Sequence, residues 1–120
     1  MPTKIHVIDD DDAVRDSTHI LLALYGYEVY SHQSAEEFLS HLVGEADCLV
    51  IDQNMPGMTG IELLEHLRAN GNQTPAVMIT GRIDVTLKPR AERMGVTVLS
   101  KPLTAEQLVF EIEQARRAQF

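Results

Sequence analysis

The chain alternates between short apolar runs and longer segments in which apolar residues recur every three or four positions. Short runs rich in Val and Ile are typical of buried strands, whereas the longer spacing is typical of amphipathic helices. The predicted strands are residues 5–8, 28–30, 48–52, 76–79 and 96–99. The helical positions that follow them in turn are Val14, Thr18, Leu21, Leu22 and Tyr25; Ala35, Phe38, Leu39 and Leu42; Ile61, Leu64 and Leu67; the segment 84–94; and Leu108, Ile112 and Ala115. Five alternations of strand and helix predict a parallel sheet covered on both faces.

Local signals set the ends of most of these helices. Ser34 with Glu37, and Thr104 with Gln107, have the spacing of capping boxes. Glycines are expected to end the first three helices, because glycine favours the left-handed conformation found after a helix. These glycines are Gly26, Gly44 and Gly71, the last preceded by Asn70.

The fourth helical segment contains a proline, Pro89, which is expected to interrupt it. Proline lacks a backbone N–H and clashes with the preceding turn, and it steers Lys88 away from helical geometry. A helix that begins near Pro89 and runs to Met94 would leave residues 82–88 as an irregular loop.

The alternation specifies a fold class and a domain organisation. Right-handed crossovers make the sheet doubly wound, and we expect a five-stranded, flavodoxin-like (βα)5 fold with strand order 2-1-3-4-5. We expect residues 1–120 to form a single domain, since the sequence shows no linker, repeat or low-complexity segment.

Charge and composition narrow the classes of function. Ten basic and 18 acidic residues give a net charge of −8, so direct nucleic-acid binding is not expected. The single cysteine, Cys48, falls in a predicted core strand and is interpreted as a buried, reduced residue. No apolar stretch is long enough to cross a bilayer, and we expect a cytoplasmic protein with no membrane partner.

Polar residues stand at the carboxyl ends of four predicted strands. Asp9 and Asp10 follow the first strand, Asp52 ends the third, Thr80 follows the fourth and Lys101 follows the fifth. These ends meet at one edge of a parallel sheet, where open α/β sheets bind ligands. Each residue alone is explained as well by capping or turn formation. Together they predict a functional site.

The chemistry of that site follows from the residue types. Crowded carboxylates need raised pKa values or a cation, and Mg²⁺ suits oxygen ligands of this kind. Asp10 and Asp52 could share one ion. A carboxylate can also attack phosphorus and form an aspartyl phosphate. Lys101 and Thr80 would then neutralise or bind phosphoryl oxygens.

The sequence resembles the receiver domain of two-component response regulators along nearly its whole length, and its N-terminal half looks most like receivers of the FixJ type. The motifs that carry the resemblance are Val7-Ile8-Asp9-Asp10, Asp52-Gln53-Asn54-Met55-Pro56-Gly57-Met58-Thr59-Gly60, Thr80-Gly81 and Lys101-Pro102. The resemblance implies a phosphoacceptor domain whose output face switches when it is phosphorylated. Such a domain is a signalling receiver and not an enzyme, although it assists its own phosphorylation and dephosphorylation.

The resemblance also assigns roles to the matching residues. Asp52 would be the phosphoacceptor. Asp10 would bind Mg²⁺ directly, Asp9 would bind the ion mainly through water, and Asn54 would offer it a backbone carbonyl. Thr80 would sense the phosphoryl group, and Lys101 would pair with that group and precede a cis peptide bond. The implied donor is a sensor histidine kinase or a histidine phosphotransfer protein. The implied partners also include an output protein that the sequence does not identify and a second copy in a homodimer.

Two features depart from the usual receiver pattern, and three other functions compete with it. Val98 stands where receivers usually have a Tyr or Phe that rotates, and Pro89 alters the fourth helix. The alternatives are a pseudo-receiver that binds partners without phosphorylation, a flavodoxin-like domain that binds a nucleotide or flavin, and a phosphatase-type hydrolase. Four consecutive acids, residues 9–12, would repel a nucleotide phosphate, and a separate general acid for hydrolysis is not evident.

Overall fold

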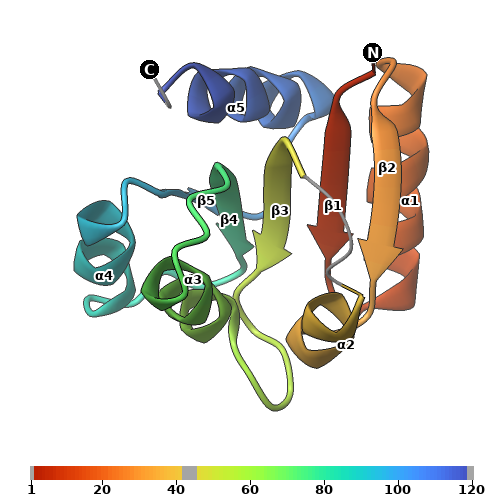
Figure 1. Ribbon diagram of the computed structural model, residues 1–120. Coiled ribbons are helices and arrows are strands. Elements are labelled where there is room, and N and C mark those ends of the chain that lie inside the picture. The colour runs from red at the N-terminus through yellow and green to blue at the C-terminus, as the bar shows by residue number, and fades with distance from the viewer. Residues whose placement is uncertain (1, 42–45, 119–120) are drawn as a thin grey trace.

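The five predicted strands form one parallel sheet in the order β2-β1-β3-β4-β5 (Figure 1). The computed structural model describes residues 2–41 and 46–118. The strands are β1 (Lys4–Ile8), β2 (Glu28–His32), β3 (Cys48–Asp52), β4 (Ala76–Thr80) and β5 (Thr97–Ser100). The predicted fold class and strand order are confirmed, and β2 lies at an edge of the sheet.

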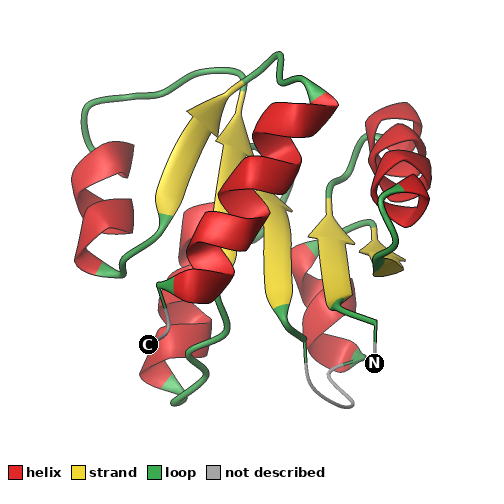
Figure 2. Ribbon diagram, turned by 90° about the horizontal axis from the view of Figure 1, so that it is seen from above, coloured by secondary structure: helices red, strands yellow, loops and turns green. Residues whose placement is uncertain are grey.

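Five helices cover the two faces of this sheet (Figure 2). They are α1 (Asp12–Leu24), α2 (Ala35–Ser40), α3 (Gly60–Ala69), α4 (Leu87–Arg93) and α5 (Ala105–Arg117). The sheet has a hydrophobic core on each face, and alternate strand residues belong to one or the other, because successive side chains of a strand point to opposite faces. Leu49 and Ile51 pack with α2, α3 and α4, whereas Cys48 and Val50 pack with α1 and α5. All of β3 is therefore buried, and its last residue, Asp52, reaches the edge from the middle of the sheet.

The predicted capping boxes have different outcomes. In α5, the Thr104 hydroxyl accepts the Gln107 N–H and the Gln107 side chain accepts the Thr104 N–H, which confirms the box. At α2, Ser34 Oγ accepts the Glu37 N–H at 3.0 Å. The Glu37 carboxylate does not return to Ser34 but accepts the N–H of Gln33 at 3.4 Å. The reciprocal half of that prediction is wrong, because the carboxylate reaches one residue further back.

Two of the three predicted glycine ends are confirmed. Gly26 and Gly71 have φ values of 93° and 83° and follow the C-caps of α1 and α3. The prediction that Gly44 ends the second helix is wrong, since α2 ends at Ser40 with His41 as its C-cap. Leu42 and Gly44, which the sequence placed in and after that helix, lie outside the described residues.

Pro89 does not interrupt α4. The helix begins at Leu87 with Pro89 as its third residue, which confirms the expected start near Pro89. Lys88 is helical, contrary to expectation. The N–H groups of a first helical turn have no partner within the helix, so proline costs no hydrogen bond there. The irregular segment before α4 is shorter than predicted and ends at Thr86.

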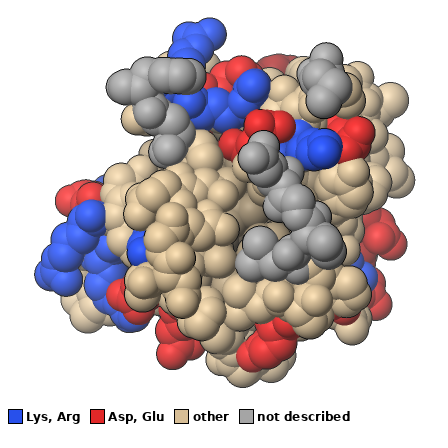
Figure 3. Space-filling model, viewed as in Figure 1, with Lys and Arg blue, Asp and Glu red and all other residues tan. Residues whose placement is uncertain are grey.

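One group of basic side chains on this acidic protein lies over α4. In Figure 3, Lys and Arg side chains lie along the left margin, where Figure 1 places α4. The residues that α4 contributes are Lys88, Arg90 and Arg93.

In the described residues, no helix has the length and apolar character needed to cross a membrane.

Candidate functional site

The strand ends bring the predicted residues to one edge of the sheet. β1 and β3 pair with Ile8 opposite Ile51, so the next residues along the two strands, Asp9 and Asp52, lie side by side. At the other side of the site, the Lys101 N–H donates to the Thr80 carbonyl at 2.8 Å. This bond continues the β4–β5 pairing and holds the chain of Lys101 beside Thr80.

Three carboxylates converge at this edge. Asp9, Asp10 and Asp52 each place an oxygen within 4.8 Å of the other two. Asp9 and Asp52 are each 6% exposed, whereas Asp10 is exposed. Burial raises the pKa of Asp9 and of Asp52. Repulsion by Asp10 and Asp11 raises the Asp9 pKa further, and repulsion by Asp9 and Asp10 does the same for Asp52. The site therefore favours a cation or a proton among its acids.

Lys101 supplies one such positive charge. Its Nζ lies 3.1 Å from Asp52 Oδ1. Burial opposes the charge of Lys101, but Asp52 together with Asp9 and Asp11 outweighs it, so the lysine pKa is raised. The contact is an ion pair without hydrogen-bond geometry, so buried Asp52 Oδ1 accepts no hydrogen bond from the described residues. An acceptor of this kind among three carboxylates fits a hard, oxygen-seeking cation such as Mg²⁺.

The four acids after β1 have separate tasks. Asp11 is the N-cap of α1, and its carboxylate accepts the Val14 N–H at 3.1 Å. Asp12 pairs with Arg15 at 2.6 Å, and the same guanidinium donates to the Asp9 carbonyl at 2.9 Å. Capping and ion pairing thus account for Asp11 and Asp12, while Asp9 and Asp10 remain in the carboxylate cluster.

The Thr80 side chain is fully buried and makes three hydrogen bonds. Its hydroxyl donates to the Arg82 carbonyl at 2.8 Å and accepts the Arg82 N–H at 3.1 Å. It also accepts from the Asn54 side-chain amide at 3.1 Å. The contact between Asn54 and Thr80 could not be predicted from the sequence, because 26 residues separate the two positions.

An apolar cleft of about 450 Å³ opens beside the carboxylates. It lies between the first turns of α1 and the segment that leads into α5, and Asp52 and Lys101 form part of its wall. The apolar side chains around it include Val14, Leu21, Leu103 and Leu108. The sequence showed the apolar positions but not that the two helices leave this space between them.

Two histidines on neighbouring strands, His6 and His32, are in contact. His6 Nδ1 lies 2.9 Å from His32 Nε2, and the two rings stack with an interplanar angle of 5°. Burial lowers the pKa of both, that of His6 to about 4. Because β1 and β2 are parallel neighbours, this contact is made by register and not by sequence spacing.

A parallel (βα)5 sheet with acids, a threonine and a lysine at its carboxyl edge defines a class of phosphoacceptor signalling domains. The chain belongs to that class: residues 5–113 match the response regulator receiver domain family. The resemblance seen in the sequence is confirmed, and the nucleotide- or flavin-binding and pseudo-receiver alternatives are not favoured.

Similar proteins agree with this membership. The chain is 42% identical to the transcriptional regulatory protein FixJ of Bradyrhizobium diazoefficiens, over 98% of this chain and 59% of that protein. It is 33% identical to the response regulator protein TodT of Pseudomonas putida, over 92% of this chain and 50% of TodT. The chain thus spans between a half and three fifths of these two relatives.

Solved structures show the same architecture. The structure of FixJ-N superposes with a TM-score of 0.87 at 34% identity and covers 98% of this chain and 95% of the other. A CheY-like receiver domain protein from Methanospirillum hungatei JF-1 superposes with a TM-score of 0.89 at 28% identity, over 99% and 97% of the two chains. Receiver domains of response regulators are signalling domains, not classical enzymes, and they interact with histidine kinases or phosphotransfer proteins. They bind Mg²⁺ at an acidic phosphorylation site, and the acidic cluster of this chain stands at the corresponding edge.

Proposed function

We propose that residues 1–120 form one receiver domain in which Asp52 accepts a phosphoryl group from a histidine kinase or a phosphotransfer protein. The observation that carries the proposal is the position of the Asp52 carboxylate, which is buried at the end of β3, 3.1 Å from the Lys101 ammonium and within the carboxylate cluster. An Asp52 oxygen forms the new bond to phosphorus as the donor's phosphorus–nitrogen bond breaks. The leaving imidazole keeps the bonding electron pair.

The surrounding residues supply charge neutralisation. The carboxylates of Asp9, Asp10 and Asp52 and the backbone carbonyl of Asn54 would hold Mg²⁺, with Asp9 acting mainly through water. The bound ion would offset negative charge on the carboxylates and on the transferred group. Lys101 moves its ion pair from Asp52 toward a phosphoryl oxygen, because the carboxylate loses its charge when it becomes an acyl phosphate.

Thr80 couples the phosphoryl group to the rest of the domain. Its hydroxyl proton is already donated to the Arg82 carbonyl, so Thr80 must release that carbonyl before it can donate to a phosphoryl oxygen. The release frees the backbone of residues 81–86, which is irregular and leads directly into α4. We therefore infer that the switch acts through this segment. Val98 is β-branched and does not supply an aromatic rotation.

The apolar cleft supports the choice of donor. A donor histidine must bring its phosphoryl group close to Asp52, and that residue forms part of the cleft wall. Apolar side chains of a kinase or phosphotransfer protein would fill the cleft while the phosphoryl group enters the carboxylate site. An output protein, or a second copy of this chain in a homodimer, would then respond to the phosphorylated state.

Phosphorylation by a small donor tests the central assignment. Acetyl phosphate with Mg²⁺ should add one phosphoryl group to the protein, as measured by mass spectrometry. The Asp52→Asn protein should not be labelled, whereas Asp16→Asn, the same change at an exposed position of α1, should be labelled normally. Labelling should fail when the cation is chelated, and Asp10→Asn should reduce it more than Asp9→Asn. Full labelling of Asp52→Asn at the wild-type rate would refute the assignment.

The same samples test the route of the switch. Beryllofluoride, a phosphoryl mimic, should change the hydrogen exchange of residues 81–86. If that segment is unaffected while β5 and α5 respond, the route through Thr80 is wrong even when Asp52 is the acceptor.

A further inference from the structure

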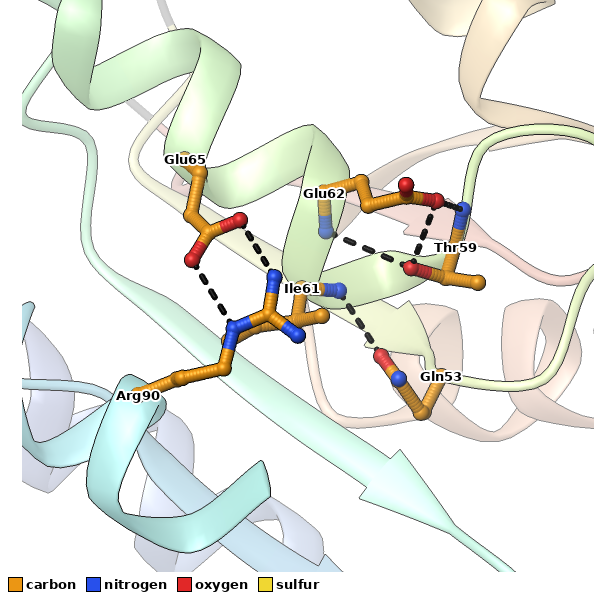
Figure 4. A network of polar contacts seen from close by, with 6 residues as sticks. All are labelled: Gln53, Thr59, Ile61, Glu62, Glu65 and Arg90. Atoms are coloured by element: carbon orange, nitrogen blue, oxygen red, sulfur yellow. Dashed lines mark hydrogen bonds and ion pairs between the residues drawn. The ribbon is translucent and has the colours of Figure 1, made fainter. Parts of the chain in front are cut away.

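Gln53, the residue after Asp52, contacts the start of α3 through its side chain (Figure 4). Its side-chain oxygen accepts the Ile61 N–H at 2.7 Å. Its backbone carbonyl accepts the Gly60 N–H at 3.1 Å, and its own N–H donates to the Ile79 carbonyl of β4 at 3.0 Å. Gln53 thus contacts both β4 and α3 through its backbone and side chain.

These contacts satisfy the beginning of α3. The first N–H groups of a helix have no partner within it. Gln53 accepts two of them, from Gly60 and Ile61, while Thr59 accepts that of Glu62. Ile61 is only 1% exposed, so its N–H would lose its partner in a buried position if the Gln53 amide were removed. A buried donor without a partner is costly, so the structure would shift the loop or the helix end to satisfy it.

The helix end cannot easily move, because it is packed against β3. A Cβ on Gly60 would lie 2.7 Å from the Asp52 carbonyl and 3.0 Å from the Ile51 side chain. Four further residues of α3 are buried in the core, namely Ile61, Leu63, Leu64 and Leu67. The part that yields is therefore the loop, in which Asn54 follows Gln53 directly.

We propose that Gln53 is a positioning residue for the cation site: by capping α3 with its side chain, it fixes the peptide that presents the Asn54 carbonyl beside Asp52. This inference rests on the proposed function, which assigns that carbonyl and carboxylate to Mg²⁺. Gln53 itself does not touch the cation. It acts through the two ligand-bearing residues on either side of it.

The chemistry of the contact distinguishes two substitutions. Gln53→Met keeps the length of the side chain but removes the acceptor for the Ile61 N–H. Gln53→Glu keeps an acceptor oxygen in the same place, and its charge is favourable at a helix N-terminus. A positioning role through this hydrogen bond predicts that Met fails and Glu restores function.

Mg²⁺ alone is the probe for the first measurement. Titration of the full chain, followed by NMR chemical shifts, should give a dissociation constant about tenfold higher for Gln53→Met than for the wild type, and within about twofold of the wild type for Gln53→Glu. The Ile61 amide should exchange faster with solvent in the Met protein. With acetyl phosphate, the Met protein should need more Mg²⁺ but reach the wild-type labelling rate at saturating Mg²⁺.

Gln107→Met is the matched control. Gln107 also caps a helix with its side-chain oxygen, which accepts the Thr104 N–H at 2.9 Å, but that helix is α5. A general effect of losing a helix cap would appear in both Met proteins, whereas the proposed role predicts unchanged Mg²⁺ affinity for Gln107→Met.

Equal Mg²⁺ affinity for wild type and Gln53→Met would overturn the inference, and so would equal weakening in Gln53→Glu. Either outcome leaves the proposed function intact if the wild type is labelled at Asp52. Failure of labelling in the wild type overturns the proposed function instead, so the two results are distinguishable.

Discussion

The loop after β3 and the segment after β4 leave the sheet at the same edge, but they are held differently. In the first, Gln53 is tied to β4 and α3, Met58 donates its N–H to Glu36 of α2 at 3.0 Å, and Met55 is buried in the core. In the second, residues 81–86 are all exposed, and Val85 is 90% exposed.

The contacts of the second segment are short in range. The Thr80 hydroxyl holds Arg82, and the Asp84 carboxylate accepts the N–H groups of Thr86 and Leu87 at 2.8 Å each. Segments with little buried surface open at low free-energy cost. The loop after β3, which carries residues proposed to bind the phosphoryl group and the cation, is therefore fixed by contacts to other elements. Residues 81–86, which are proposed to respond to phosphorylation, are held by a few local hydrogen bonds.

Matched glycine substitutions should show the largest contrast between the two regions. Gly60→Ala places a methyl group 2.7 Å from the Asp52 carbonyl, and we expect it to lower the free energy of unfolding by about 1–3 kcal/mol because β3 or α3 must shift. At Gly81 no described atom lies within 4 Å of the added carbon, so Gly81→Ala should change stability by less than about 0.5 kcal/mol. Urea denaturation measures both. Similar losses in the two proteins would show that the regions are equally constrained.

Lowering the pH should reduce the difference in stability between the fixed loop and the segment 81–86. Burial lowers the His6 pKa from 6.5 to about 4, with smaller effects from His32 and Lys4. Because the folded pKa lies below the unfolded one, this group's stabilisation is complete above pH 6.5 and is lost as pH falls toward 4. The ring is half-buried, so we expect a loss on the order of 1 kcal/mol over that range.

That loss lowers the free energy of global unfolding. It should therefore reduce the hydrogen-exchange protection of the loop after β3 more than that of residues 81–86, which open locally. Denaturation at several pH values should show a shallower pH dependence for His6→Gln than for the wild type. His66→Gln, at an exposed position of α3, is the control. An unchanged slope in His6→Gln would locate the acid sensitivity elsewhere, with His32, His41 and Glu37 as the neighbouring titratable groups.

The smallest expected effect comes from an ion pair between α3 and α4, the helices that follow the two regions. Arg90 of α4 contacts Glu65 of α3 through two hydrogen bonds of 3.0 and 2.6 Å, and both side chains are more than a third exposed (Figure 4). A double-mutant cycle with Glu65→Gln and Arg90→Gln should give a coupling of about 0.2–1 kcal/mol that shrinks in high salt. A larger, salt-insensitive coupling would mean that α3 and α4 move as one body.

Much of the fold follows from local sequence pattern. Short apolar runs and helical spacings are properties of neighbouring residues, so the strands, the helices and the caps at Thr104 and Gly26 could be predicted without tertiary information. The meeting of Asp9, Asp52 and Lys101 at one edge could also be predicted, because parallel strands carry their carboxyl ends to the same side.

The tertiary structure decided which residues contact one another across elements. The Gln53 cap of α3, the bond from Asn54 to Thr80 and the stacking of His6 on His32 each depend on strand register or on where a helix docks. The sequence pattern carries no signal for such pairings, because the partners are 8–26 residues apart and their distances are set by packing of the whole core. The start of α4 was decided in the same way: burial of Leu87 and Ala91 against the sheet places Pro89 in the first turn, where its missing N–H has no cost.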